Sequence, residues 1–379
     1  MRVSGPGSNP GVSSKPITGE LLSEEQINAY NHTKNPGPNQ LKQNFFDWCI
    51  HVLLSHPNRH VTIDLDRVNE ISKTLEPQDP AKAYDFADDM TPEAADRTRP
   101  INPELVFFAL ALNISNQGGY IYECPNGKPA VWQKDGIDVN AFNDLFRELS
   151  EKDLLPGLPE SRIKNPDDVE TLMKPALVQE NREPVPFLRD RLQVFKEFAS
   201  PGAWEKLAKI LNSTRKEDGS YHFDFKSIHD IAKTFPVSFG RDVFLKKAAL
   251  LPMLFASNAN TRGEKVSIDG IVAADFWLPW TDHNTGMTKL SDEIVESLEK
   301  QEIMRPDDLR VQQMRAATIV ISDLMAQLSG KQINEIDALK WLERLDGSLR
   351  TFQDETKAVA ETEGRKISKN PMLVPTFNF

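Results

Sequence analysis

The chain has 379 residues, of which 39% are hydrophobic and 27% are charged, and its formal net charge is −11. This composition is typical of a globular protein, and the acidic balance argues against a surface that grips the backbone of a polynucleotide. The two cysteines, Cys49 and Cys124, provide neither a disulfide framework nor a four-cysteine zinc site, which fits a reducing compartment. The longest apolar run, Leu105 to Leu112, is far shorter than the roughly 20 residues that a membrane helix needs. We therefore expect a cytoplasmic protein without a membrane partner.

The N-terminal residues are rich in Gly, Pro, Ser and Asn and show no hydrophobic period. We expect residues 1–40 to form a disordered or loosely attached arm. From Leu41 to Leu54, apolar residues recur at the spacing of a helix with one buried face. A short strand is expected from His60 to Leu65, and helical spacing returns from Leu65 to Leu75.

The segment from Glu76 to Pro100 is polar and acidic. Its carboxylates Asp85, Asp88 and Asp89 suggest a cation site, but their spacing does not match an EF-hand loop, and no glycine occupies the turn position. A solvated acidic loop is the favoured interpretation.

The rest of the chain is mostly helical in pattern, with one clear β signal. An apolar helix is expected from Pro103 to Asn113. Two short strand-like runs, 120–123 and 130–132, then flank an Asn126-Gly127 pair, which is typical of a hairpin turn. Helices are expected over residues 138–152, 166–179, 186–199, 202–213, 225–234, 241–257, 290–300, 306–329 and 333–361. The sequence thus predicts a mainly α fold, with residues 41–379 forming a single large helical domain that carries a small β-hairpin.

Standard catalytic motifs are missing from the sequence. There is no Gly-rich phosphate loop, no His-Glu-x-x-His, no Gly-x-Ser-x-Gly and no dinucleotide fingerprint. His222 and His229 are seven residues apart, a spacing that can share one helical face, but a third ligand is not evident. We therefore expect no metal and no cofactor. His283 lies in a polar turn close to Asp275, where a solvated histidine is the favoured interpretation and a titrating functional group the alternative.

A single carboxylate, Asp275, lies inside the aromatic and apolar run Ala273–Trp280. A charged side chain in such surroundings is normally paired, hydrogen-bonded or used in function. Phe276, Trp277 and Trp280 beside it would suit a slot for a flat, polar ring. An aspartate beside aromatic residues is also common where a helix begins, and these residues alone favour that role as a cap.

Three cations lie in apolar helical sequence. Lys246 and Lys247 are adjacent between Val243 and Leu251, about 100° apart on a helix, so that both cannot easily reach solvent without an anionic partner. The planar guanidinium of Arg315 suits a carboxylate or a phosphate. The alternative for Arg315 is an internal ion pair, for example with Asp275, and the pattern alone slightly favours that alternative.

Seven segments, read in order between residues 55 and 379, have counterparts in one known family. They are 110–115, 185–191, 235–242, 244–251, 274–280, 314–316 and the aromatic tail 371–379. In these segments the chain resembles the queuosine salvage family, the queuosine 5′-phosphate N-glycosylases that release queuine. Phe235–Asp242 is similar to the family's Phe-Pro-Ser-Phe-Arg-Asp motif, and Ala274–Trp280 resembles its Ala-Asp-Tyr-Arg-x-Pro-Gln motif.

The chain departs from the family pattern around Asp275. Phe276 replaces a tyrosine, Trp277 an arginine and Trp280 a glutamine. Other departures are Lys247 for arginine, Ala249 for glutamine and Gln313 for glutamate. The polarity that faces the substrate is altered, which leaves the identity of the base more open than the reaction type.

The resemblance implies an N-glycosidase that hydrolyses queuosine 5′-monophosphate or a related modified nucleotide and needs no metal. It also implies a fold similar to that of helix-hairpin-helix DNA glycosylases. Asp275 would stabilise the positive charge that grows on the sugar and would activate the attacking water. Lys246, with help from Lys247 or Arg315, would bind the 5′-phosphate.

The base would be held by stacking and by hydrogen bonds to its edge. The residues implied for stacking are Phe276, Trp277 and Trp280. The residues implied for reading the edge of a deazaguanine-like base are Asn113 and Asp242.

Two alternatives remain from the altered residues around Asp275. One is a diverged relative that binds a nucleotide or a protein partner without catalysis. The other is a glycosylase for a different nucleoside, in which the larger tryptophan side chains reshape the pocket. The acidic charge favours a single nucleotide over a polynucleotide in each case.

Overall fold

Helices dominate the part of the chain that the structure, a computed structural model, describes. The described residues are 38–75, 121–123, 129–131, 161–173, 188–260 and 263–372 apart from positions 55, 58, 348 and 369, together with 149, 152–154, 156 and 374. The expected mainly α fold with a small β-hairpin is confirmed. None of the helices in these residues has the length and apolar character that crossing a membrane requires.

The described helices lie between Pro38 and Thr362. They are α2 (Pro38–Leu54), α3 (Leu65–Thr74), α9 (Pro166–Leu172), α11 (Leu188–Phe198), α12 (Ala203–Thr214), α13 (Phe225–Thr234), α14 (Lys246–Asn260), α15 (Trp277–Asn284), α16 (Asp292–Glu299), α17 (Leu309–Ser329), α18 (Ile333–Asp346) and α19 (Arg350–Thr362).

The described strands are short and pair in twos. They are β1 (Val61–Ile63), β2 (Ile121–Glu123), β3 (Pro129–Val131), β4 (Tyr221–Asp224), β5 (Val266–Asp269) and β6 (Thr288–Leu290). The pair β2–β3 is the expected antiparallel hairpin. β1 pairs antiparallel with β6, and β4 pairs parallel with β5, two pairings that the sequence analysis does not predict.

Local signals explain the helices whose ends match the prediction. α13 has the predicted bounds because the Asp224 carboxylate accepts the backbone N–H of Ser227 at 2.8 Å and so caps the helix. Ile228 and Ile231, three residues apart on α13, are fully buried. α9 begins with a capping box in which Asn165 and Asp168 satisfy each other's backbone N–H groups.

Several helix ends differ from the prediction, and three of the differences have a clear local cause or consequence. α2 begins at Pro38, so the last three residues of the expected arm are helical. The expected helix over 333–361 is two helices, α18 and α19, because Gly347 between them has a left-handed backbone with φ of 64°. α14 begins at Lys246 instead of residue 241, since the side chain of Asp242 accepts the Lys246 N–H at 2.8 Å.

Several predicted elements lie outside the described residues. They are the arm over residues 1–37, the acidic loop 76–100, the helix 103–113 and most of the helix 138–152.

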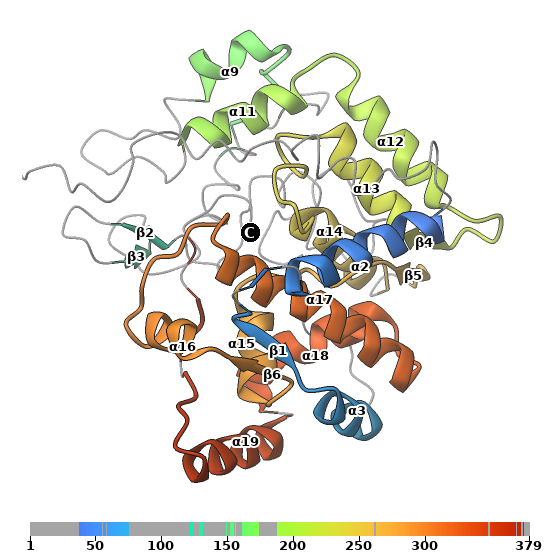
Figure 1. Cartoon of the computed structure of the whole chain (residues 1–379). Helices are drawn as coiled ribbons and strands as arrows, with labels where there is room; N and C mark the ends of the chain where they lie inside the picture. The colour runs from blue at the N-terminus through green and yellow to red at the C-terminus, as the bar shows by residue number, and fades with distance from the viewer. Residues whose placement is uncertain are drawn as a thin grey trace, which may run out of the picture.

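The helix α17 lies at the centre of the packing. α2, α3 and β1 from the N-terminal part of the chain pack against it, as do α15 and α18. In Figure 1 the blue α2 runs beside the orange α17, although a long stretch of chain separates them. α13 connects this group to α12, α14 and β4. The segment 271–275, which leads into α15, lies near α13, α14 and α17.

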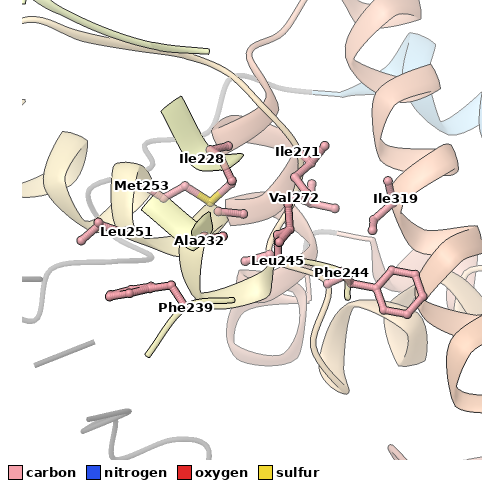
Figure 2. Packing of buried hydrophobic residues seen from close by; sticks show 14 of the residues in the cluster. Ile228, Ala232, Phe239, Phe244, Leu245, Leu251, Met253, Ile271, Val272 and Ile319 are labelled. Atoms are coloured by element: carbon pink, nitrogen blue, oxygen red, sulfur yellow. The ribbon is translucent and has the colours of Figure 1, made fainter. Parts of the chain in front are cut away.

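A continuous apolar core fixes that segment (Figure 2). Ile271 and Val272 are fully buried and lie with Ile228 of α13, Leu245 just before α14 and Ile319 of α17. Full burial of a side chain of this size contributes about 1.5–3 kcal/mol relative to leaving it exposed. The backbone that precedes Asp275 is therefore anchored by packing before any polar contact is considered.

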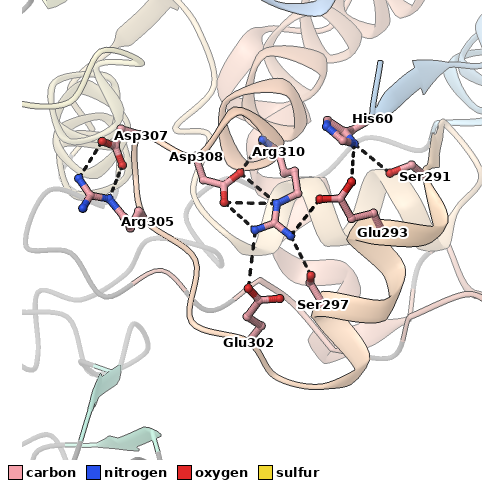
Figure 3. A network of polar contacts seen from close by, with 9 residues as sticks. All are labelled: His60, Ser291, Glu293, Ser297, Glu302, Arg305, Asp307, Asp308 and Arg310. Atoms are coloured by element: carbon pink, nitrogen blue, oxygen red, sulfur yellow. Dashed lines mark hydrogen bonds and ion pairs between the residues drawn. The ribbon is translucent and has the colours of Figure 1, made fainter. Parts of the chain in front are cut away.

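A polar network holds the start of α17 (Figure 3). Arg310 bonds to side chains of α16 and of the segment between the two helices, namely Glu293, Ser297, Glu302 and Asp308. His60, just before β1, lies 3.2 Å from the Ser291 hydroxyl. Partly exposed ion pairs contribute little singly and more as a network. This network ties β1 and α16 to the N-terminus of α17.

Gly240 allows a close approach of two backbone segments. A Cβ atom there would lie 2.6 Å from the Ala232 carbonyl oxygen and 2.9 Å from the Pro236 Cα. We expect Gly240→Ala to lower the free energy of unfolding by about 1–3 kcal/mol, because backbone atoms must move. Gly270→Ala is the matched control. Its Cβ would meet the end of the Ile228 side chain and no backbone atom, so we expect a smaller loss of stability. Urea unfolding measures both, and equal stabilities would contradict this account.

Candidate active site

Asp275 caps the start of α15. Its Oδ1 accepts the backbone N–H groups of Trp277 at 2.7 Å and of Leu278 at 3.2 Å, so the predicted role as a cap is confirmed. The residue is only 7% exposed. Within the described residues its second oxygen, Oδ2, has no hydrogen-bond partner. A fixed carboxylate thus keeps one oxygen for another ligand.

Lys246 is the first residue of α14 and faces the same carboxylate. Its side chain is buried, and burial lowers the pKa of Lys246, while the negative charges of Asp275 and then Asp242 raise it. In the part of the chain that the structure describes, its ammonium forms no hydrogen bond or ion pair. The charges of Asp275 and Lys246 therefore interact, but the two side chains form no hydrogen bond or ion pair with each other.

Arg315 is joined to Asp242 in a buried, bidentate ion pair. Its Nη1 and Nη2 atoms each lie 2.7 Å from one Asp242 oxygen, and its Nε donates to the Ala274 carbonyl at 2.8 Å. The guanidinium also lies 4.5 Å from the ring centre of Phe244. The internal ion pair considered for Arg315 exists, but its partner is Asp242 and not Asp275.

A group of cations surrounds Lys247, which is 1% exposed. Burial lowers the pKa of Lys247 well below its usual value, and the positive charges of Arg191, Lys246 and Arg241 lower it further. Asp190, which pairs with Arg241, acts in the opposite direction. Three positive charges and one negative charge therefore act on Lys247.

Aromatic rings follow Asp275 directly along α15. The ring centres of Phe276 and Trp277 are 5.6 Å apart, and those of Trp277 and Trp280 are 5.8 Å apart in an edge-to-face arrangement. All three side chains are partly exposed. The Trp280 Nε1 is buried and has no hydrogen-bond partner within the described residues. The three rings thus form an apolar surface next to the carboxylate.

The structure therefore brings together most of the predicted site residues. Those that it brings near the start of α14 and α15 are Asp242, Lys246, Lys247, Asp275, Phe276, Trp277, Trp280 and Arg315. Asn113 lies outside the described residues. Asp242 and Arg315 are predicted to contact substrate, but in the structure both are occupied by each other and by backbone groups.

The histidines lie apart from this group. His283 is 3% exposed and accepts the Ser368 N–H at Nε2, 3.4 Å away, so the expectation of a solvated histidine is wrong. His222 is in β4 and His229 in α13, so they do not share a helical face. No group of three potential metal ligands occurs among the described residues.

Besides Arg191, three buried charged residues near the site are absent from the predicted site residues. Asp337 accepts the Ala273 N–H at 2.6 Å. Asp282 and Lys340 form an ion pair at 2.6 Å in which both side chains are fully buried. Asp337 and Lys340 flank Ala338 and Leu339 in α18, and a charged residue beside such apolar neighbours is the same signal that identifies Asp275.

No protein-family model matches the chain, and a search of curated proteins found no match.

The contribution of the buried Arg315–Asp242 pair to stability can be tested. We expect Arg315→Met to lower the free energy of unfolding by about 3–5 kcal/mol, because Asp242 and the Ala274 carbonyl would lose their buried partner. Urea unfolding of the purified variant measures this. Arg305→Met, which removes an exposed pair with Asp307, should change stability little. Similar losses in the two variants would show that burial of the first pair is unimportant.

Buried His283 predicts a pH dependence of stability. Burial lowers the pKa of His283 from 6.5 to about 4, so the unfolded chain binds one more proton than the folded chain between these pH values. We expect stability to fall by up to about 3 kcal/mol as the pH drops through this window. His283→Gln should flatten the change, whereas His51→Gln, at an exposed position, should not. Identical pH profiles of wild type and His283→Gln would contradict the assignment.

Proposed function

We propose that the chain is an N-glycosidase that hydrolyses queuosine 5′-monophosphate or a related modified nucleotide and releases the base. One observation carries the proposal. Asp275 Oδ2 and the Lys246 ammonium, both on buried side chains, have no hydrogen-bond partner within the described residues. Neighbouring buried pairs such as Arg315 and Asp242 bond each other. Opposite charges that lie close together on mostly buried side chains without bonding each other are found mainly where a ligand supplies the partner.

The carboxylate of Asp275 suits the chemistry of the N-glycosidic bond. As the bond between C1′ and the base nitrogen breaks, its electron pair leaves with the base and positive charge grows on the sugar. An ionised Asp275 beneath C1′ would stabilise that charge and take a proton from the attacking water, whose oxygen then bonds to C1′. The helix N–H groups on Oδ1 hold the carboxylate in place while Oδ2 acts.

The 5′-phosphate is assigned to the cations at the start of α14. Lys246 faces Asp275, and Lys247 lies among Arg191 and Arg241. Phosphate oxygens accept charge-assisted hydrogen bonds from a lysine ammonium, and positive charges nearby strengthen that attraction. Since Arg315 and Asp242 bond each other, we assign these two residues to the support of the site and the phosphate to Lys246, with help from Lys247.

The base is assigned to the aromatic surface of Phe276, Trp277 and Trp280. Stacking of a base on an aromatic ring contributes about 1–3 kcal/mol and tolerates different bases. We retain Asn113 as a candidate for reading the base edge on the strength of the family resemblance. The reaction is assigned to the cytoplasm, with a mononucleotide as the substrate and without a polynucleotide or membrane partner.

One observation favours a second candidate. Trp277 and Trp280 pack edge-to-face, where the family has an arginine and a glutamine. This apolar pair suits a nucleoside with a different base, or a relative that binds a nucleotide or protein partner without cleaving it. A panel of nucleosides and nucleotides separates the first possibility from the second.

The proposal predicts the effect of one substitution. Asp275→Asn should reduce the release of queuine from queuosine 5′-monophosphate by about 10³-fold or more, because asparagine can neither take the proton nor offer the negative charge. Its stability should change little, since asparagine caps helices as well as aspartate does. Mass spectrometry of free queuine and urea unfolding measure the two effects.

A matched control comes from another capping aspartate. Asp64 accepts the Arg67 N–H at the start of α3, away from the site, and Asp64→Asn should leave turnover unchanged. Wild-type turnover in Asp275→Asn would show that Asp275 is not the catalytic residue. A wild type that is stabilised by the nucleotide without releasing the base would instead support a binding protein. Neither release nor binding would indicate another substrate.

A further inference from the structure

The backbone that carries Asp275 is held by charged side chains of two other helices. Asp337 of α18 accepts the Ala273 N–H at 2.6 Å. Arg315 of α17 donates to the Ala274 carbonyl at 2.8 Å and is itself fastened to Asp242. The Val272–Ala273 peptide is thus held through its N–H and the Ala274–Asp275 peptide through its C=O, in a segment whose side chains are already buried.

The other end of α15 is fixed by the same helix, α18. Lys340 lies 2.6 Å from one oxygen of Asp282, and the Thr318 hydroxyl donates to the other oxygen at 2.6 Å. Lys340 also donates to the Ser322 hydroxyl at 2.7 Å. Asp337 and Lys340 are three residues apart and therefore share one face of α18. That face holds the segment before α15 through Asp337 and the C-terminal half of α15 through Lys340.

We propose that Asp337 is a positioning residue, which holds Asp275 in the orientation needed for attack on the sugar. This inference rests on the proposed function. Asp337 is 2% exposed and bonds the backbone two residues before Asp275. A displacement of about 1 Å in a reacting group can cost about 10²-fold in rate. Loss of this hydrogen bond would free the Ala273 amide and loosen the cap that Asp275 forms on Trp277 and Leu278.

The charge of Asp337 has a second, separable effect. It raises the pKa of Lys246, in opposition to the effect of burial, and so favours the ammonium form of that lysine. Asp337→Asn removes the charge but keeps an oxygen that can accept the Ala273 N–H. Asp337→Leu removes both, and Asp337→Ser, which is too short to reach Ala273, serves if the leucine variant does not fold.

Hydrogen exchange and steady-state kinetics on the full chain test the inference. In Asp337→Leu or Asp337→Ser, we expect the amides of Ala273, Trp277 and Leu278 to exchange about tenfold faster, as the loss of one hydrogen bond implies. We expect kcat for queuosine 5′-monophosphate to fall about 10²-fold, and any rise in KM to be the same in Asp337→Asn, which loses the same charge. Asp337→Asn should restore the slow exchange and most of kcat.

Asp224→Leu is the matched control, because Asp224 likewise accepts a backbone N–H, that of Ser227, on a different helix. It should speed exchange at the start of α13 and leave α15 unchanged. Wild-type exchange at Trp277 and Leu278 in Asp337→Ser would overturn the inference, even if the wild type hydrolyses the nucleotide. If the wild type releases no base, the proposed function fails, and the exchange data alone still decide whether Asp337 positions Asp275.

Discussion

The bidentate pair between Arg315 and Asp242 joins three parts of the chain: α17, the residues that begin α14 and the segment that leads into α15. Each Asp242 oxygen accepts one guanidinium N–H and one backbone N–H, those of Phe244 and Lys246. A buried ion pair is tolerated only when its groups are satisfied in this way. The pair therefore determines where α14 begins, and through Ala274 it determines where the chain turns toward α15.

The surrounding contacts explain why Asp275 and Lys246, whose side chains are mostly buried, can lie close together without forming an ion pair. Desolvated ions normally shift their protonation or are compensated by neighbours. Here the backbone at Asp275 and Lys246 is fixed by interactions that those side chains do not make themselves. Leu245, between Asp242 and Lys246, even adopts a left-handed backbone with φ of 56°, which is unfavourable for leucine. Such strain persists where the surroundings over-determine the conformation, as at functional sites.

A structural feature can be predicted from the sequence when the interaction that determines it lies between residues close together in the chain. The bounds of α13 follow from Asp224 and from apolar spacing within ten residues, and they are predictable. Asp275 and Lys246 stand out because charged residues interrupt apolar runs. The partner of Arg315 is 73 residues away, and the contact between Asp337 and Ala273 spans 64 residues, so neither pairing leaves a periodic signal. The strands β4 and β5, of four residues each, are too short for alternation to show.

The position of α2 beside α17 has a consequence for synthesis on the ribosome. α2 ends at Leu54, and α17 begins only at Leu309, so about 250 residues must be made before the two helices can meet. At about 5–20 residues per second, this delay is on the order of 10–50 s. During that time the side of α2 that contains Cys49, which is fully buried in the finished protein and close to Arg315 of α17, lacks this neighbour. We therefore expect the nascent chain to bind chaperones that shield apolar segments.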